Sequence, residues 1–185
     1  MASKFAHLHV HSEFSLLEGA CRFDALLNKV KALGMNAVAL TDFGNLFGSL
    51  TFYEKATNLQ IKPILGCEVF VTRNRFEKAT QGIRDPMYRL ILLAENNQGF
   101  ANLRRISTIG YMEGFYYRPR IDREILNQYK EGLIAIACHD GGEITRNYLD
   151  RNLDSVDLSI QNYLKIFGEN NFFIEIVRVG NEHED

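Results

Sequence analysis

Short apolar runs alternate with amphipathic stretches along most of this chain. The short apolar runs predict strands, and apolar residues at three- and four-residue spacing predict helices. The predicted strands are Phe5–Val10, Ala37–Leu40, Pro63–Val71, Tyr88–Ala94, Leu133–Cys138 and Phe172–Val177. The predicted helices are Arg22–Leu33, Leu46–Leu59, Gly99–Tyr111, Ile121–Tyr129, Ile144–Leu149 and Leu153–Phe167.

This alternation favours parallel strands joined by helical crossovers, in either a doubly wound sheet or a β/α barrel. The segment Arg73–Pro86 matches neither pattern and predicts a polar surface loop. A closed eight-stranded barrel typically takes about 250 residues, so a barrel built from six predicted strands would be small or truncated. The length of 185 residues and the hydrophobic content of 46% are those of a single domain, which we assign to residues 1–185.

Polar residues with metal-binding chemistry recur at or near the ends of the apolar runs. His9 and His11 lie at the end of the first run, Asp42 at the end of the second and His139 directly after Leu133–Cys138, whereas Glu68 lies within the third run or just past its main apolar part. Alternate residues of a strand point to the same face, and in parallel α/β folds the carboxyl ends of the strands open onto the same side. These imidazoles and carboxylates could therefore converge. Such a donor set suits zinc, manganese or iron better than calcium, and several metal ions held this way would favour phosphoester hydrolysis.

Each of these residues also has a purely structural interpretation. The histidine-rich start of the chain could be a polar edge strand, and Asp42 could cap the next helix or shape a turn. Glu68 could be a satisfied strand carboxylate, and His139 could be an ordinary loop residue. Glu18 could reach the histidines or could only belong to a turn.

Composition and charge narrow the class of protein. Twenty-one basic and 23 acidic residues give a net charge of −2, so the chain lacks the basic character that nucleic-acid binding by the whole surface would need. No apolar run is long enough for a membrane span, and the N-terminus does not predict a signal peptide. Three cysteines, an odd number at wide spacing, favour a reduced, cytoplasmic protein.

Several stretches together resemble the PHP (polymerase and histidinol phosphatase) domain, in the form that opens the alpha subunit of bacterial DNA polymerase III. They are His7–Ser12, Phe14–Ala20, Thr41–Gly48, Ile61–Glu68, Glu113–Tyr116, Pro119–Asp122 and Glu131–Ala135. The resemblance covers essentially the whole chain. It implies a distorted seven-stranded β/α barrel with a multi-metal centre at the strand ends, and the closing strands and the last ligands are expected beyond Asp185.

The resemblance also implies roles for individual residues. The family's metal ligands fall on His9, His11, Glu18, Glu68 and His139. His7 and Asp42 are expected to contact and orient the ligands without binding the metal themselves. Phe43 and Arg89 stand where metal-binding members have histidines, and neither side chain can ligate a metal. The site is therefore expected to be partly degenerate, with Zn²⁺ or Mn²⁺ as its metal.

The function that the resemblance implies is that of the N-terminal part of a replicative DNA polymerase. The polymerase carboxylates and their Mg²⁺ are expected outside this chain, so the chain alone should not extend a primer. Its expected partners are other polymerase III subunits, notably the proofreading exonuclease, and DNA through the rest of the subunit. An active metal-dependent phosphoesterase or 3′–5′ nuclease, and a free-standing phosphatase of the histidinol-phosphate kind, remain alternatives.

Overall fold

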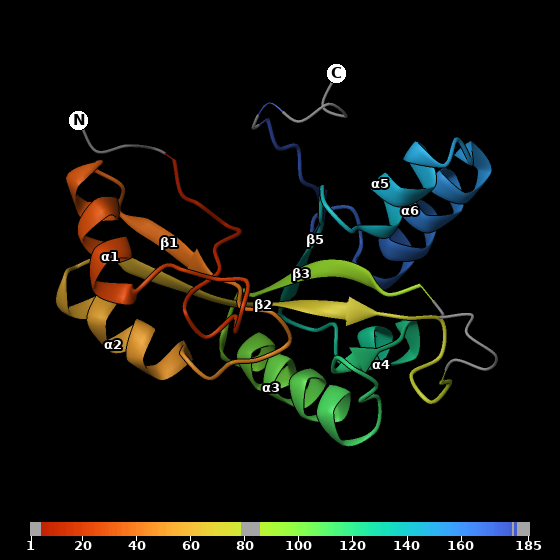
Figure 1. The fold of residues 1–185 in the computed structure, drawn as a ribbon, viewed down its shortest axis with the longest axis horizontal. Coiled ribbons are helices and arrows are strands. Elements are labelled where there is room, and N and C mark those ends of the chain that lie inside the picture. The colour runs from red at the N-terminus through yellow and green to blue at the C-terminus, as the bar shows by residue number, and fades with distance from the viewer. Residues whose placement is uncertain (1–4, 79–85, 179, 181–185) are drawn as a thin grey trace.

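Six strands and six helices make up the part of the chain that the computed structural model describes, which is residues 5–78, 86–178 and 180 (Figure 1). The strands are β1 (Ala37–Leu40), β2 (Lys62–Val71), β3 (Tyr88–Ala94), β4 (Arg120–Ile121), β5 (Leu133–Ala137) and β6 (Phe172–Ile174). The helices are α1 (Phe23–Ala32), α2 (Ser49–Asn58), α3 (Asn97–Met112), α4 (Arg123–Gln128), α5 (Glu143–Leu149) and α6 (Leu153–Phe167). Within the described ranges, no helix has both the length and the apolar character that a membrane span requires.

The strands form one sheet in the order β1-β2-β3-β5-β6, and β4 pairs with the end of β2. Five strands run in one direction, but β3 is antiparallel to both β2 and β5. The expectation of parallel strands throughout is wrong for β3. The loop after β2 contains no predicted helix, and a connection without a crossover helix returns as a hairpin, which makes the second strand antiparallel. Residues 79–85 of that loop lie outside the described residues.

The predicted first strand, Phe5–Val10, is an extended segment that pairs with β1 only at separate points. The N–H of Ala39 donates to the C=O of His7 at 2.8 Å, and the N–H of Thr41 donates to the C=O of Val10 at 2.8 Å. Three residues on the N-terminal segment therefore span two on the β1 side, as in a β-bulge. This extra residue breaks the regular ladder, so the prediction of a regular strand is wrong here.

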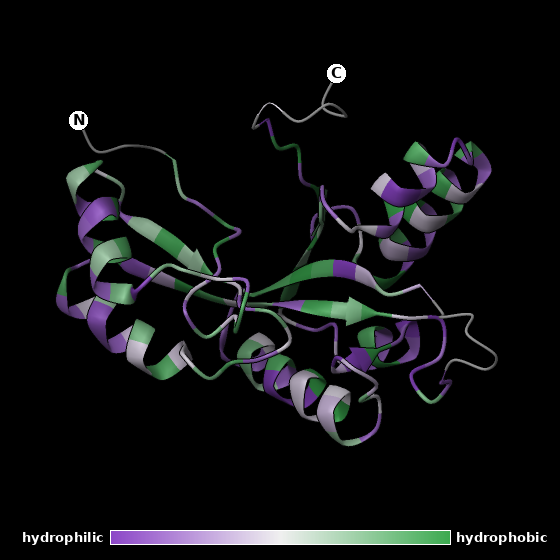
Figure 2. Ribbon diagram, viewed as in Figure 1, coloured by the Kyte–Doolittle hydropathy of each residue, from purple (hydrophilic) through white to green (hydrophobic). Residues whose placement is uncertain are grey.

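The two faces of the sheet differ in what covers them. Alternate residues of β2, β3 and β5 pack with α3, α4 and α6 in the largest apolar cluster, and β1 packs in the same way with α1 and α2. Apolar residues are concentrated in the central strands, as Figure 2 shows. The opposite face carries a smaller cluster, which includes Ile91, Leu93 and Ile136. Glu68 pairs across the ladder with Ile91, so it points to this inner face, away from the helices.

A group of ion pairs, which we call the Arg75 network, fixes the short strand β4 and the start of α4. Arg75 Nη1 donates to Asp122 at 2.9 and 3.1 Å, and Arg75 Nε donates to Glu113 at 2.8 Å. Asp122 also accepts from the N–H of Ile125 and so caps α4. Glu124 is the fourth member, 3.2 Å from Arg75 Nη1.

Candidate metal centre

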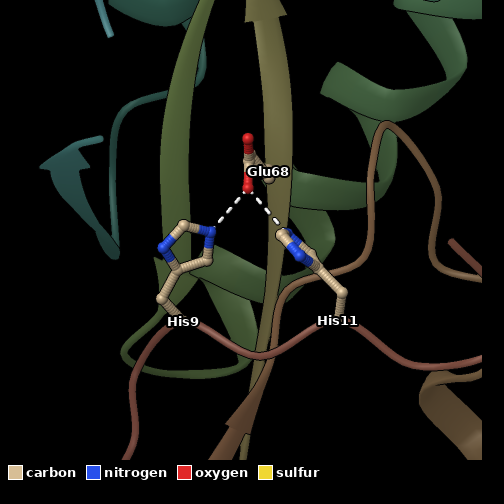
Figure 3. Close-up of side chains that lie close together, drawn as sticks. All are labelled: His9, His11 and Glu68. Carbon is tan, nitrogen blue, oxygen red and sulfur yellow. Dashed lines mark hydrogen bonds and ion pairs between the residues drawn. The ribbon is translucent and has the colours of Figure 1, made fainter. Parts of the chain in front are cut away.

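Three side chains converge on the inner face of the sheet, and we call them the histidine–glutamate cluster: His9, His11 and Glu68. Glu68 Oε2 lies 2.6 Å from His9 Nε2 and 2.7 Å from His11 Nε2. The two imidazoles come from the same N-terminal segment and approach the carboxylate from either side (Figure 3). One potential ligand atom from each residue lies within 4.8 Å of the others. Two nitrogens and a carboxylate oxygen at this spacing could hold a metal ion.

Backbone pairing places Glu68 against the loop that follows β1. The N–H of Glu68 donates to the C=O of Asp42 at 3.1 Å, and the N–H of Gly44 donates to the C=O of Glu68 at 2.8 Å. The side chain of Glu68 is fully buried. A carboxylate at this depth needs partners that keep it ionised, and the two imidazoles provide them.

Asp42 holds the loop behind the histidines. Its carboxylate accepts hydrogen bonds from the N–H of Ser12 at 2.6 Å and from the hydroxyls of Ser12 at 2.7 Å and Ser15 at 2.6 Å. Asp42 is buried and does not belong to the cluster. Its contacts fix the backbone directly after His11, which is a supporting position.

A second carboxylate, Glu175, holds the other side of His9. His9 Nδ1 lies 2.7 Å from Glu175 Oε1, and Glu175 Oε2 accepts from the N–H of His139 at 3.1 Å. Burial lowers the pKa of His9, but the hydrogen bonds to Glu175 and Glu68 outweigh it and raise that pKa to about 9. His9 is therefore protonated at neutral pH while no metal is bound. With a metal on Nε2, Nδ1–H would still donate to Glu175, which is how carboxylates orient metal-bound histidines.

The two oxygens of Glu68 have different environments. Burial raises the pKa of this carboxyl, but the hydrogen bonds from His11 and His9 keep the pKa below its ordinary value. Both imidazoles contact Oε2, and Oε1 is buried with no hydrogen-bond partner among the described residues. An ionised carboxylate with one buried oxygen that accepts no hydrogen bond from a described residue fits a site that accepts one cation.

Phe43 and Arg89 occupy the positions where the resemblance places further histidines. The ring of Phe43 stacks on His11, with 3.9 Å between centroids and 24° between planes. Arg89 Nε lies 3.6 Å from Glu68 Oε1, and Arg89 Nη1 lies 3.2 Å from Asp140. A stacked phenyl ring and a guanidinium donate no electron pair to a metal. The residues therefore fit one ion at the cluster but do not fit the multi-metal centre that the resemblance implies.

The other predicted site residues lie around the cluster. Glu18 forms an ion pair with Arg118, and it does not join the histidines. His139 contributes its backbone N–H to Glu175, and its side chain does not belong to the three-residue group. His7 is exposed and packs edge-on against Phe5. Of the five predicted ligands, the structure brings together only the histidine pair and Glu68.

Glu175 is the residue that the sequence argument missed. It follows β6 directly, so it obeys the same strand-end rule that selected His139. The sequence predicts a strand over Phe172–Val177, which places Glu175 inside the strand and not after its end. Among the described residues, the ladder between β6 and β5 covers Phe172–Ile174, so the strand ends before Glu175.

The chain belongs to the PHP domain family, whose model matches residues 7–179. Its relatives are DNA polymerase III alpha subunits. That of Borreliella burgdorferi is 43% identical over 184 residues, and that of Thermus aquaticus is 45% identical over 181 residues. These matches cover 99% and 96% of this chain but only 16% and 15% of the relatives. The subunit of Aquifex aeolicus is 47% identical over 76% of this chain and 13% of its own length. The match is to the PHP region of these subunits.

Two solved structures share the fold. A protein from Bifidobacterium adolescentis described as a metal-dependent phosphoesterase superposes with a TM-score of 0.56 and 13% identity, over 97% of this chain and 79% of that one. An amidohydrolase from Chromobacterium violaceum gives a TM-score of 0.54 at 14% identity, over 92% and 76%. At these identities the likeness concerns the fold alone, and it agrees with the PHP-type α/β architecture that the sequence predicts.

Proposed function

We propose that this chain is the N-terminal PHP region of a DNA polymerase III alpha subunit and acts there mainly as a structural and interaction module. Its relatives at 43–47% identity support this assignment. The full subunit would carry out template-directed DNA synthesis, with carboxylates and Mg²⁺ outside residues 1–185. The barrel would be closed by strands that follow in the longer chain.

The observation that carries the structural role is the contact of Arg89 with the buried carboxylate of Glu68. A fixed cation beside a metal ligand repels divalent ions, and Phe43 fills the neighbouring position with carbon. One ion at most is compatible with this arrangement. We assign it to Zn²⁺ or Mn²⁺, because two imidazoles and one carboxylate suit these ions, and we assign His9, His11 and Glu68 as its ligands. Such an ion would supply Lewis acidity and would also tie the N-terminal segment to the sheet.

The partners of this module would be other subunits of the replicase, in particular the proofreading exonuclease. Exposed apolar side chains support an interaction role, because contiguous exposed apolar surface marks protein contacts. Phe47, Tyr111 and Phe115 form a row on the surface, with ring centroids 6.4 and 6.1 Å apart. DNA would be bound through the remainder of the subunit.

An active metal-dependent phosphoesterase or 3′–5′ nuclease is the second candidate. Glu68 Oε1, which accepts no hydrogen bond from a described residue, and the paired imidazoles favour it, because they resemble half of a hydrolytic centre. A free-standing phosphatase of the histidinol-phosphate kind is a weaker candidate, because the relatives are polymerase subunits.

Metal content and hydrolysis separate these candidates. The chain is purified without chelator, its Zn and Mn are measured by mass spectrometry, and phosphate release and single-stranded DNA degradation are assayed with added Mn²⁺. We expect at most about one ion per chain and no hydrolysis above that of a His9→Ala/His11→Ala control. Two or more ions per chain, with hydrolysis that the control lacks, would establish the phosphoesterase instead.

A further inference from the structure

We infer that Arg89 and Phe43 act as a coupled pair in which the Arg89 guanidinium replaces one cation of the metal centre and neutralises Glu68 from within the protein. This rests on the proposed function, since it explains how a partly degenerate site stays folded. Phe43 and Arg89, the two departures from the metal-binding pattern, then form a single replacement. Two independent losses of histidine would leave residues that do not contact each other.

The two oxygens of the Glu68 carboxylate face different partners. Both imidazoles contact Oε2, whereas Arg89 Nε faces the other oxygen, Oε1, at 3.6 Å. A fully buried carboxylate with an uncompensated oxygen is strongly unfavourable, and a neighbouring positive charge offsets this. Arg89 therefore stands on the side of the carboxylate that the histidines leave open.

The second support is that the two departing residues contact each other. The guanidinium carbon of Arg89 lies 5.0 Å from the centroid of the Phe43 ring, within the range of a cation–π interaction. The same ring stacks on His11. Phe43 therefore links the guanidinium to a metal-binding histidine, and a histidine at position 43 would not hold Arg89 in the same way once protonated.

The third support is that Arg89 is held in place from the far side. The backbone N–H of Arg89 donates to the C=O of Gly141 at 2.9 Å, and the guanidinium of Arg89 pairs with Asp140. Gly141 has a φ of +67°, and a Cβ at this position would lie 3.0 Å from Arg89 Cδ. The turn after β5 thus leaves room for the arginine side chain, and a residue other than glycine would displace it.

The register of the sheet explains why position 89 reaches the carboxylate. Ile91 is the ladder partner of Glu68, and Arg89 lies two residues earlier on the antiparallel strand β3. The two side chains are therefore diagonal neighbours on the same face, a separation that a long side chain can span. Because β3 runs in the opposite direction, its beginning lies at the edge where the parallel strands end.

The test compares Arg89→Gln with Arg118→Gln in thermal unfolding of the chain in EDTA. Arg118 is a matched control, since it also lies over a phenyl ring, that of Phe70 at 5.3 Å, and pairs with a carboxylate, that of Glu18, which is partly exposed. We expect Arg89→Gln to lower the midpoint by about 5 °C and Arg118→Gln by less than about 2 °C. Arg89→Lys, which keeps the charge, should recover about half of the loss.

Metal rescue provides the second measurement. The double variant Phe43→His/Arg89→His should bind one more ion per chain than the parent and gain about 5 °C or more on addition of Mn²⁺. The combined effect of Arg89→Gln and Phe43→Leu should be smaller than the sum of their separate effects, because each removes the same contact.

Equal, small losses for Arg89→Gln and Arg118→Gln would overturn the inference, as would additive effects of Arg89→Gln and Phe43→Leu. If Arg89→Gln does not fold, Arg89→Lys decides: a loss well short of unfolding supports a role for the charge, and a failure to fold contradicts it. These readouts are independent of hydrolysis. Hydrolysis by the parent chain would refute the proposed structural role and leave the stability comparison intact.

Discussion

The Arg75 network and the histidine–glutamate cluster are both groups of ionisable side chains around a buried carboxylate, but they differ in how completely hydrogen bonds satisfy that carboxylate. Asp122 accepts from the guanidinium and the backbone N–H of Arg75 and from the N–H of Ile125, so both of its oxygens are used. Glu68 concentrates its two hydrogen bonds on Oε2, and Oε1 has none from any described residue.

This difference is the one we expect between a structural group and the proposed metal-binding group. Arginine keeps its proton at every physiological pH and offers several donors in a fixed plane, so it suits a permanent contact between loop and helix. Histidine exchanges protons and coordinates metals, so its contacts can be replaced by an ion. The Arg75 network should therefore contribute to stability with or without metal wherever its carboxylates are ionised, and the histidine–glutamate cluster should depend on metal and on pH around neutrality.

Loss of the central carboxylate of the Arg75 network should have the largest effect. Asp122→Ala leaves the buried guanidinium of Arg75 without its main partner and removes the cap of α4. We expect a loss of about 3–5 kcal/mol in the free energy of unfolding, measured by urea titration. The control is Glu124→Gln: its carboxylate is 77% exposed, so the loss should stay below about 1 kcal/mol. Similar losses for the two variants would show that the network is not a buried structural group.

The second-largest effect is expected in the pH dependence of stability, which should differ between the Arg75 network and the histidine–glutamate cluster. In the metal-free chain the pKa of His9 is raised from 6.5 to about 9, so its stabilising contribution is complete below pH 6.5 and disappears as pH rises through 9. The shift corresponds to a loss on the order of 3 kcal/mol. The pKa of Arg75, although burial lowers it, is raised overall by its carboxylate partners and lies far above this window.

Urea titrations in EDTA at pH 6.5, 8 and 9.5 measure this loss. His9→Gln is the control, and its stability should change little over the same interval. The carboxyl of Glu68 has the opposite sign, because its lowered pKa gives stability that is present above pH 4.5 and is lost on further acidification. If the stability of the parent chain changed as little with pH as that of His9→Gln, the ion pairs of His9 with Glu68 and Glu175 would be contradicted.

The sequence predicts most of the elements because their apolar spacing is regular. Helix α6 matches its predicted range, Leu153–Phe167, and β1 and β3 match theirs. The direction of β3 was missed, although the segment before it, Arg73–Pro86, contains no predicted helix and carries that information. The short strand β4 was also missed, because two residues carry no periodicity, and what fixes it is the pairing of Phe70 and Val71 with Arg120 and Ile121.

The sequence predicts the histidine pair and Glu68 of the cluster, but it does not predict which side chains Glu18 and His139 contact. Glu68 follows from its position in β2, and the histidine pair follows from its spacing. Glu18 lies on a loop whose course depends on a partner a hundred residues away, Arg118. No local pattern in the sequence reports such a contact, so only the fold shows that Glu18 has another partner.

Glu175 should tune the metal affinity of His9 by a smaller amount. Glu175→Gln keeps an acceptor near Nδ1 but removes the charge that orients the imidazole. We expect a roughly tenfold weaker affinity for Zn²⁺ in a chelator-competition titration. In the metal-free chain the pKa of His9, followed by NMR, should fall from about 9 towards 6.5. Glu169→Gln, at an exposed position before the same strand, serves as the control, and equal affinities for the two variants would refute the orienting role.

The smallest effect is expected at Glu18, where the resemblance and the geometry disagree. The resemblance makes Glu18 a ligand, whereas the structure pairs it with Arg118, outside the three-residue group. On the geometry, Glu18→Gln should change the affinity for Zn²⁺ by less than about twofold, and Glu68→Gln should weaken it by a hundredfold or more because a charged ligand is lost. A large loss for Glu18→Gln would mean that metal binding moves the loop, breaks the pair with Arg118 and adds a fourth ligand. That result would make the cluster an incomplete form of a larger site, and it would place the first loop with the histidines as part of the binding region.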